Sequence, residues 1–361
     1  MNHPSLEPYE KLVQEKYINK QEQGDLILFN YTDSCTFERK WDEYTLAARG
    51  IIFNKLTGDC IARPLGKFFN ISENERTLVK NLPDEPYEVF EKVDGSLGIL
   101  YFNQNRLHIS TRGSFTSQQA ITATEILRTK YPNFTPPVGV TLLFEIIYPE
   151  NRMTAGGRLV VDYGDMRDLI LLAGIYLDPS KGELSYEALL ALSTENGFPI
   201  AKKYSYTIAE MIEMQKTLPV EQEGFVVHYL KSNFRVKIKG NEYCIRQKLI
   251  NDITPLNLWA LFKNGFLPDT YKMEIPEEIL PEALAIEEKL KQKYDAIHAE
   301  IVDDASKIPY PFSNETRKDI ALWLQANKLK HHRIMFSHLM GKKEDVEEWV
   351  LELIRPKSNI L

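Results

Sequence analysis

One lysine stands immediately before a turn signal in the first third of the chain. Residues 91–101 read EKVDGSLGILY, which places Lys92 two residues before Asp94 and Gly95. An Asp-Gly pair favours a sharp turn, because glycine accepts backbone angles that are closed to other residues. A lysine held at such a fixed place can act as a nucleophile once its ammonium loses a proton, since an ammonium has no lone pair. The alternative is an ordinary turn between two strands, EVFEKV and GILYF.

Motifs rich in cations, carboxylates and glycine lie on both sides of this lysine. Upstream, Arg49 precedes a glycine and the apolar run IIFN, and Lys67 begins the run KFFN. Downstream come TRGS, FEIIYPENR, EGFVV and KIKGNEY, at residues 111–114, 144–152, 223–227 and 237–243. Fixed cations of this kind stabilise the negative charges of phosphate groups. The motifs therefore indicate a site for a phosphorylated substrate.

Taken in this order, the motifs resemble those of the ATP-dependent RNA ligases, most closely the phage-type RNA ligase 1 family that reseals broken tRNA. The resemblance covers roughly residues 45 to 245, and its most specific element is the KxKxxxY pattern of Lys237, Lys239 and Tyr243. The fungal and plant tRNA ligases carry a related adenylation domain. The resemblance implies a nucleotidyltransferase in which Lys92 attacks the α-phosphate of ATP and retains AMP.

The resemblance implies that the chemistry rests on five charged residues. The expected catalytic residues are Lys92, Glu145, Glu223, Lys237 and Lys239. Lys237 and Lys239 would contact the α-phosphate, and Glu145 would accept hydrogen bonds from the ribose hydroxyls. We expect burial and nearby cations to lower the pKa of Lys92, because both disfavour its ammonium form. The alternative for Lys237 and Lys239 is a solvated strand edge, since FRVKIKG places both on one face.

Further residues would line the ATP site. The resemblance implies that Arg49 and Lys67 reach the outer phosphates and that Val226 packs against the adenine. The complete expected ATP-binding set is Arg49, Lys67, Glu91, Lys92, Arg112, Glu145, Val226, Lys237, Lys239 and Tyr243. Arg112 departs from the family pattern, which commonly has a lysine in a KGS-type motif. The cation is kept there, but its shape and hydrogen-bonding fork differ.

The resemblance also implies a magnesium ion. Glu223 would hold a hydrated ion through its waters, and Asp269 stands where the family places a second acidic residue that positions those waters. Magnesium suits this arrangement, because it dehydrates reluctantly and is usually held by few carboxylates together with substrate phosphates. ATP and Mg²⁺ are thus the expected substrate and cofactor.

Composition bounds the class of protein. The 361 residues include 44 basic and 51 acidic side chains, a formal charge of −7, which disfavours tight nonspecific binding to nucleic acid. A local basic groove can still bind RNA. Cys35, Cys60 and Cys244 show no zinc-ligand spacing and are expected to be reduced thiols. Neither a signal region nor a membrane-length apolar run is found, so we expect a cytoplasmic protein, and we expect a monomer.

The hydrophobic pattern changes near residue 248. Before it, alternating segments such as LGILYF, TLLFEII and FRVKIK predict strands, and after it apolar residues step by three or four. We expect an α+β, antiparallel-sheet adenylation domain at 1–247 and an all-α domain at 248–361. DNA ligases and capping enzymes continue instead into a β-rich OB domain. Helices within the first domain are expected at residues 5–20, 116–130 and 184–196.

A basic cluster marks the helical tail. It consists of Lys328, Lys330, His331, His332, Arg333, His338, Lys342 and Lys343. Two interpretations stay open: a phosphate-binding surface that selects tRNA, or a solvated helix face beside the acidic run EDVEE. The paired histidines have no third ligand at metal spacing.

The sequence therefore predicts an ATP-dependent RNA ligase that joins 5′-phosphate and 3′-hydroxyl ends through a lysyl-AMP and an RNA-adenylate. The expected partner is RNA, in particular broken tRNA. Because no GxxxxGK[ST] loop is present, end healing would fall to a separate kinase or phosphatase. The alternatives are another covalent nucleotidyltransferase, either a DNA ligase or an RNA-capping enzyme, and a non-catalytic RNA- or nucleotide-binding relative. The full set of charged motif residues counts against the last of these.

Overall fold

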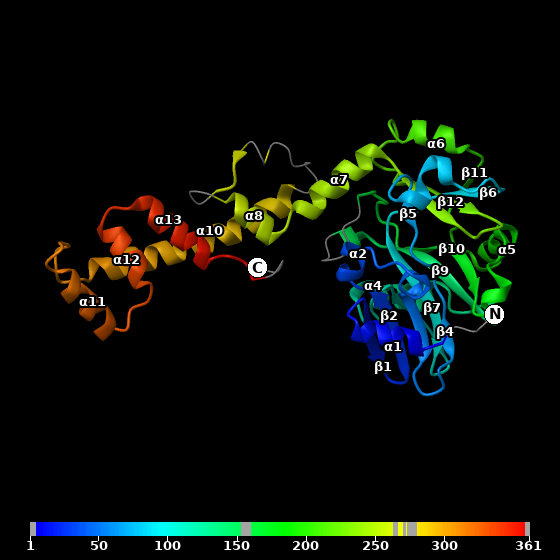
Figure 1. The fold of residues 1–361 in the computed structure, drawn as a ribbon, viewed down its shortest axis with the longest axis horizontal. Coiled ribbons are helices and arrows are strands. Elements are labelled where there is room, and N and C mark those ends of the chain that lie inside the picture. Colours follow the sequence, from blue (N-terminus) through cyan, green and yellow to red (C-terminus); the bar gives the residue numbers. More distant parts are fainter. Residues whose placement is uncertain (1–4, 153–159, 263–265, 270–271, 273–279, 358–361) are drawn as a thin grey trace. The chain divides into compact units, whose positions relative to one another are not determined.

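A computed structural model describes residues 5–152, 160–262, 266–269, 272 and 280–357 (Figure 1). The chain divides into two compact units, Met1–Gln247 and Lys248–Leu361. The first unit contains three sheets and the second contains helices. Antiparallel sheets followed by C-terminal helices agree with the predicted fold class.

The first sheet is an antiparallel meander at the N-terminus. Its strands are β1 (Ile18–Gln23), β2 (Leu26–Tyr31), β3 (Arg49–Asn54) and β4 (Cys60–Ala62). Two short helices, α2 (Asp33–Phe37) and α3 (Glu43–Ala47), connect β2 to β3. Asp42 caps α3 through the N–H groups of Tyr44 and Thr45.

The helix predicted at residues 5–20 is wrong in its second half. Helix α1 covers Glu7–Gln14, and the chain then turns at Lys16, whose φ of 66° is outside the helical region. From Ile18 the residues pair with β2 instead, which buries Ile18 in the core. Sheet pairing outweighs the local helical pattern here.

The second sheet is antiparallel, in the order β10-β9-β7-β8. Its strands are β7 (Ser96–Asn103), β8 (Arg106–Thr111), β9 (Val140–Ile147) and β10 (Asp168–Tyr176). Helices α4 (Gln118–Lys130) and α5 (Tyr186–Asn196) begin and end close to their predicted ranges. Both share an apolar core with this sheet. A second core joins it to the first sheet.

The third sheet has the strand order β11-β6-β12-β13-β5 and includes β6, which ends directly before Lys92. Its strands are β5 (Phe69–Asn70), β6 (Tyr87–Glu91), β11 (Lys203–Tyr204), β12 (Gly224–Tyr229) and β13 (Arg235–Lys239). Helix α6 (Ile208–Met214) packs on one face, where Val236 and Ile238 are fully buried. The alternation of β13 therefore turns Lys237 and Lys239 to the other face.

Helix α7 (Asn241–Asp252) follows β13 and runs across the division between the units. The helices of the second unit are α8 (Pro255–Leu261), α10 (Leu280–Ser306), α11 (Arg317–Ala326), α12 (His332–Leu339) and α13 (Lys343–Leu353). They enclose two apolar clusters, one around Leu290 and one around Leu324. None of the described helices is both long enough and apolar enough to cross a membrane.

Candidate active site

A cavity of about 1100 Å³ lies in the first unit, lined by residues of the second and third sheets and of strands β2 and β3. All ten residues of the predicted ATP-binding set line it, as does Glu223. The predicted metal residue Asp269 belongs to the second unit, where its side chain is exposed. The fold therefore brings motifs that are almost 200 residues apart in the sequence to the lining of one cavity.

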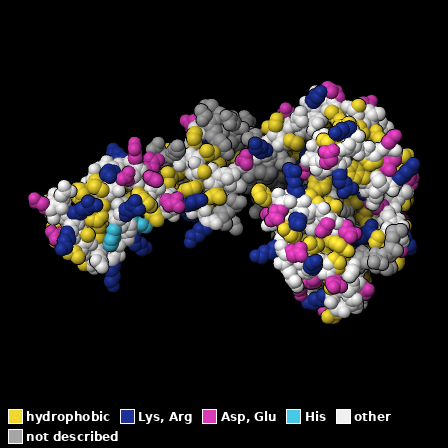
Figure 2. All heavy atoms as spheres, viewed as in Figure 1, with side chains coloured by type: hydrophobic (Ala, Val, Ile, Leu, Met, Phe, Trp, Pro, Cys, Tyr) yellow, Lys and Arg dark blue, Asp and Glu magenta, His cyan; other side chains and the backbone are white. Residues whose placement is uncertain are grey.

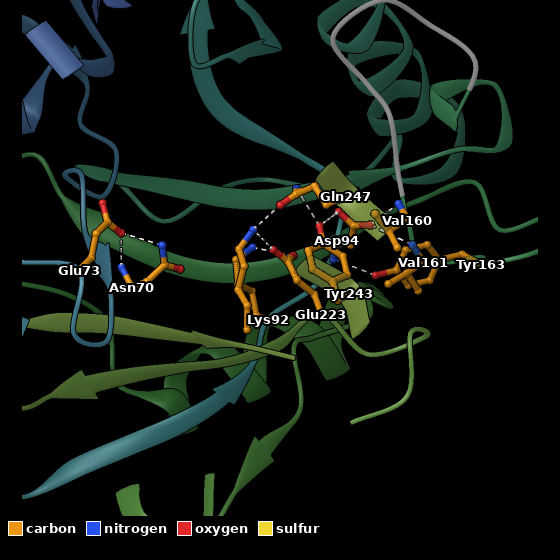
Figure 3. A network of polar contacts seen from close by, with 11 residues as sticks. Asn70, Glu73, Lys92, Asp94, Val160, Val161, Tyr163, Glu223, Tyr243 and Gln247 are labelled. Atoms are coloured by element: carbon orange, nitrogen blue, oxygen red, sulfur yellow. Dashed lines mark hydrogen bonds and ion pairs between the residues drawn. The ribbon is translucent and has the colours of Figure 1, made fainter. Parts of the chain in front are cut away.

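Lys92 stands at the end of β6, where the main chain is fixed by a hydrogen bond from its N–H to the Gly224 carbonyl (2.9 Å). Its Nζ lies 2.6 Å from Oε2 of Glu223, a carboxylate that is almost fully buried (Figure 3). Burial by itself disfavours the ammonium, but the carboxylates of Glu223 and Glu145 outweigh burial and raise the pKa of Lys92. The predicted lowering of this pKa is therefore wrong, because the nearest charges are carboxylates.

Glu223 joins two of the predicted catalytic lysines. Its Oε1 lies 2.9 Å from Nζ of Lys239, while its Oε2 holds Lys92. Lys239 also donates to Oε1 of Gln247 (3.0 Å) and lies over the ring of Tyr243 at 5.0 Å. Gln247 was not predicted, although it stands one helical turn after Tyr243 on α7, a spacing that places two side chains on one face.

Asp94 does more than form a turn. Its Oδ2 accepts hydrogen bonds from the N–H groups of Val160 (2.7 Å) and Val161 (2.9 Å), and its Oδ1 accepts one from the Tyr243 hydroxyl (2.9 Å). In return, the Asp94 N–H donates to the hydroxyl of Tyr163 (2.8 Å). Figure 3 shows these partners around the carboxylate. The run VVDYG thus fixes the loop after Lys92, and its residue types alone did not single it out.

Glycine is required after Asp94 by a close approach to β9. A Cβ at Gly95 would lie 2.6 Å from Cγ of Glu145 and 2.9 Å from the Ile146 carbonyl oxygen. Glu145 is pressed against this backbone within the cavity. Burial raises the pKa of Glu145 to about 8, against the opposing charge of Lys92. Burial therefore favours the protonated form of this carboxyl more than in an exposed glutamate.

Lys237 is the lysine with the depressed pKa. Burial lowers its pKa to about 7, and the charges of Lys67, Lys92 and Lys239 act in the same direction. No carboxylate of the described residues forms an ion pair with it, in contrast to Lys92 and Lys239. The neighbouring positive charges that were predicted to lower the pKa of Lys92 therefore lower the pKa of Lys237 instead.

The remaining predicted cations lie against aromatic rings. The guanidinium of Arg49 lies 5.6 Å from the Phe68 ring, and that of Arg112 lies 5.0 Å from the Tyr31 ring. Gly50 permits this packing, since its φ is 98° and a Cβ would stand 3.1 Å from Cα of Arg112. The ammonium of Lys67 also lies near Tyr31 and two other rings. Sequence reasoning missed Tyr31.

Two further residues of the predicted ATP-binding set, Glu91 and Val226, belong to strands of the third sheet. Glu91 pairs with Phe225 across β6 and β12, and its N–H donates to the Lys202 carbonyl (2.8 Å). Val226 pairs with Lys237 in β13, and its half-buried side chain lines the cavity.

The donor set bears on the predicted metal. Among the described residues, no three His, Cys, Asp or Glu side chains gather as ligands of one ion. Glu223 offers one buried carboxylate in the cavity, beside Lys92 and Lys239. Such a set fits magnesium held mainly by water and phosphate oxygens. Asp269 lies 4.0 Å from Lys272 in the other unit, and its role stays a prediction.

The basic cluster of the tail surrounds α12. Figure 2 shows histidine side chains beside Lys and Arg on the second unit. His331 precedes α12 with a φ of 60°, and the guanidinium of Arg333 lies 3.8 Å from the Trp349 ring. Both interpretations of the cluster are compatible with this placement.

Known proteins match this chain over most of its length. An RNA ligase family model matches residues 47–243, more than half of the 361 residues. A predicted RNA ligase of Thermovibrio ammonificans is 25% identical over 367 aligned residues, which cover 91% of this chain and 92% of that protein. A predicted bifunctional polynucleotide kinase/RNA ligase of Autographa californica nuclear polyhedrosis virus is 26% identical over 255 residues, covering 63% of this chain and 34% of the viral protein.

Solved structures match more distantly. An archaeal ATP-dependent RNA ligase is 15% identical with a TM-score of 0.47, and the match covers 80% of this chain and 78% of that one. A Naegleria gruberi RNA ligase mutant solved with ATP and Mn is 18% identical with a TM-score of 0.34. That match covers 45% of this chain and 52% of the Naegleria chain, about half its length. On the family match, this chain belongs to the phage-type ATP-dependent RNA ligase family.

Proposed function

We propose that this protein joins RNA ends through three nucleotidyl transfers. In the first, Nζ of Lys92 attacks the α-phosphorus of ATP, forming an N–P bond while the P–O bond to pyrophosphate breaks. In the second, a 5′-phosphate oxygen of RNA attacks the same phosphorus, and the N–P bond breaks as Lys92 regains a proton. In the third, a 3′-hydroxyl oxygen attacks the phosphorus of the RNA 5′-phosphate and loses its proton. The bond from that phosphorus to AMP breaks, and AMP leaves.

The observation that carries this proposal is the meeting of Lys92 with Glu223, Lys237 and Lys239 in one cavity. A lysine that must react with a phosphate needs fixed cations that stabilise the charge developing on the phosphate oxygens. Lys237 and Lys239 supply them from one face of β13. Tight packing of Gly95 against β9 and the hydrogen bonds of Asp94 hold the nucleophile's loop in place.

Other residues would bind the rest of ATP. The cations Arg49 and Lys67 line the same cavity and suit the outer phosphates, while Glu145 suits the ribose hydroxyls. A protonated Glu145 can donate one hydrogen bond as well as accept others. Because carboxylates raise the pKa of Lys92, its deprotonation requires added positive charge nearby. Magnesium, when held through waters at Glu223, supplies such charge.

The proposed substrate is RNA with a 5′-phosphate and a 3′-hydroxyl, in particular broken tRNA. The proposal assigns the chemistry to the first unit and tRNA selection to the second, where the basic cluster lies. The viral relative is named as a kinase joined to a ligase, and this chain spans 34% of it. This supports a separate end-healing enzyme as the partner of the present protein.

The test is the intact mass of the purified protein after incubation with ATP and magnesium. We expect a gain of one adenylate per chain, located on Lys92 by peptide mapping. Lys92→Ala should gain none, whereas Lys231→Ala, which changes an exposed lysine at the cavity wall, should gain it as the wild type does. An unmodified wild type, or an adduct that persists in Lys92→Ala, would refute the assignment.

Parallel reactions separate the alternatives. GTP in place of ATP tests for a capping enzyme, and nicked DNA in place of RNA tests for a DNA ligase. A protein that binds ATP without gaining mass would belong to the non-catalytic alternative. Joining of RNA ends with ATP and magnesium, but not with GTP and magnesium, completes the assignment.

A further inference from the structure

Five of the cations that line the cavity fall into two groups by the contacts they make. Lys92 and Lys239 are ion-paired with Glu223. Lys67, Arg49 and Arg112 instead lie against aromatic rings, and no ion pair of these three with a carboxylate occurs within the part of the chain that the structure describes. The second group therefore keeps an uncompensated positive charge, which is suited to an anion.

Lys67 has the most complete aromatic surroundings of these cations. Its Nζ lies 5.5 Å from the centre of the Tyr31 ring, 5.7 Å from that of Trp41 and 5.4 Å from that of Phe69. All three distances are within the range of a cation–π interaction. We call Lys67 with these three rings the caged cation. The rings attract the ammonium without neutralising it, so its position is restrained while its charge stays available.

Trp41 contacts both of the other rings around Lys67. Its ring meets that of Tyr31 at 5.2 Å and 85° and that of Phe69 at 5.6 Å and 73°, both edge-on arrangements that aromatic pairs favour. Tyr31 in turn accepts a hydrogen bond from Nη1 of Arg112 (2.6 Å). The loss of the Trp41 ring would therefore remove one of the three rings around Lys67 and loosen the other two.

The caged cation lies along the sheet from the nucleophile. Strand β5, which contains Phe69, pairs in parallel with β13, so that Phe69 stands opposite Val236 and Asn70 opposite Lys237. Lys67, Lys92 and Lys237 line the same cavity, and Lys237 is close enough to the other two for their charges to lower its pKa. A chain of phosphates that begins at Lys92 can therefore contact Lys237 and Lys67 as well.

In-line displacement uses the side of the α-phosphorus opposite Lys92 in both of the first two transfers. In the first transfer Lys92 and pyrophosphate stand on opposite sides of the α-phosphorus. In the second transfer Lys92 is the leaving group on that same phosphorus, so the incoming 5′-phosphate of RNA must enter opposite Lys92. That is the side from which pyrophosphate departed.

We propose that the caged cation, whose lysine the family resemblance already assigns to the outer phosphates of ATP, also binds the 5′-phosphate of RNA in the second transfer, with Trp41 and Phe69 as its positioning residues. The inference rests on the proposed ligase function. Tyr31 and Trp41 precede residue 47, where the family match begins. Tyr31, at the end of β2, and Trp41, between α2 and α3, therefore complete a site whose other members lie within the family region.

The test uses full-length enzyme that has first been loaded with AMP on Lys92 and freed of ATP. One portion receives pyrophosphate, which reverses the first transfer, and another receives 5′-phosphorylated RNA, which undergoes the second. The variants are Trp41→Leu, which removes the ring, and Trp41→Phe, which retains one. Phe102→Leu, at an exposed position of β7 outside the cavity, controls for loss of an aromatic side chain.

We expect the half-saturating concentrations of pyrophosphate and of 5′-phosphorylated RNA both to rise about 10-fold in Trp41→Leu, the effect of losing one half-buried cation–π contact. Maximal rates should stay within about 2-fold, and Trp41→Phe within about 3-fold of wild type. Inhibition by RNA with a 5′-hydroxyl should not change, because that RNA brings no phosphate to the caged cation. Phe102→Leu should resemble the wild type.

Two results would overturn the inference. A rise for pyrophosphate alone would show that the RNA 5′-phosphate binds elsewhere. No rise for either substrate in a folded Trp41→Leu would show that the cage does not position Lys67. If Trp41→Leu melts at a much lower temperature than wild type, Phe69→Leu repeats the test. A wild type that gains no AMP from ATP would refute the ligase proposal itself, which is a separate outcome.

Discussion

The depressed pKa of Lys237 makes a quantitative prediction about ATP binding. In the free protein this pKa is about 7, because burial and three neighbouring lysines disfavour the ammonium. If the charged form binds the α-phosphate, ATP binding should be independent of pH below about 7 and weaken above it. At about pH 8 only about one tenth of the molecules carry the ammonium, so the half-saturating ATP concentration should be about 10-fold higher than at about pH 6.

The assay is the single-turnover rate of Lys92 adenylylation against ATP concentration, measured from about pH 6 to about pH 9. The half-saturating concentration reports Lys237, whereas the maximal rate reports Lys92 itself, which must lose a proton and should react faster as pH rises. Lys237→Arg keeps a charge at every pH in this range, so its half-saturating concentration should be flat. Its maximal rate should nevertheless be low, because a guanidinium does not replace a compact ammonium at a close-packed phosphate.

A flat wild-type profile would refute this reasoning. It would mean either that Lys237 keeps its proton throughout or that it does not contact ATP. Lys231→Ala provides the matched control, since Lys231 lines the same cavity but is exposed, and its profile should follow that of the wild type.

Three other predictions concern separate parts of the molecule. Lys239→Ala should slow adenylylation by about 10²- to 10³-fold, as for loss of one donor at developing charge, and a near-normal rate would place this lysine at an ordinary strand edge. Gly95→Ala should destabilise the fold by about 1–3 kcal/mol in urea unfolding, since its Cβ would lie 2.6 Å from the Glu145 side chain, and an unchanged midpoint would contradict the close packing. Charge reversal at Lys328 and Lys330 should flatten the salt dependence of tRNA binding by about one unit per lost phosphate contact without altering adenylylation, and an unaltered slope would identify a solvated helix face.

Local periodicity was sufficient for much of the first unit. The predicted strands LGILYF and TLLFEII lie within β7 and β9, because apolar segments of this length pack within a sheet wherever the strand lies. Alternation in FRVKIK placed Lys237 and Lys239 on one face of β13. Periodicity failed at residues 15–20, where pairing of Ile18 with Tyr31 displaced a helix.

The motifs could also be identified from the sequence, because each consists of neighbouring residues whose spacing is set by one strand or one turn. Lys92, Glu223 and Lys237 could be named because the chemistry of phosphate transfer requires cations and a carboxylate in any fold. Their connection to ATP was implied by a resemblance, and the family match supports that connection.

Tertiary structure alone decided how these residues act on one another. Lys92 and Glu223 are 131 residues apart, yet their ion pair reverses the expected direction of the Lys92 pKa. Asp94 is fixed by residues 160–161, which carry no signal of their own. Trp41 gave no indication of function, because a single aromatic residue has no periodicity, and its value arises only where Lys67 lies against it. Electrostatic energy depends on distance in space, which a linear pattern does not contain.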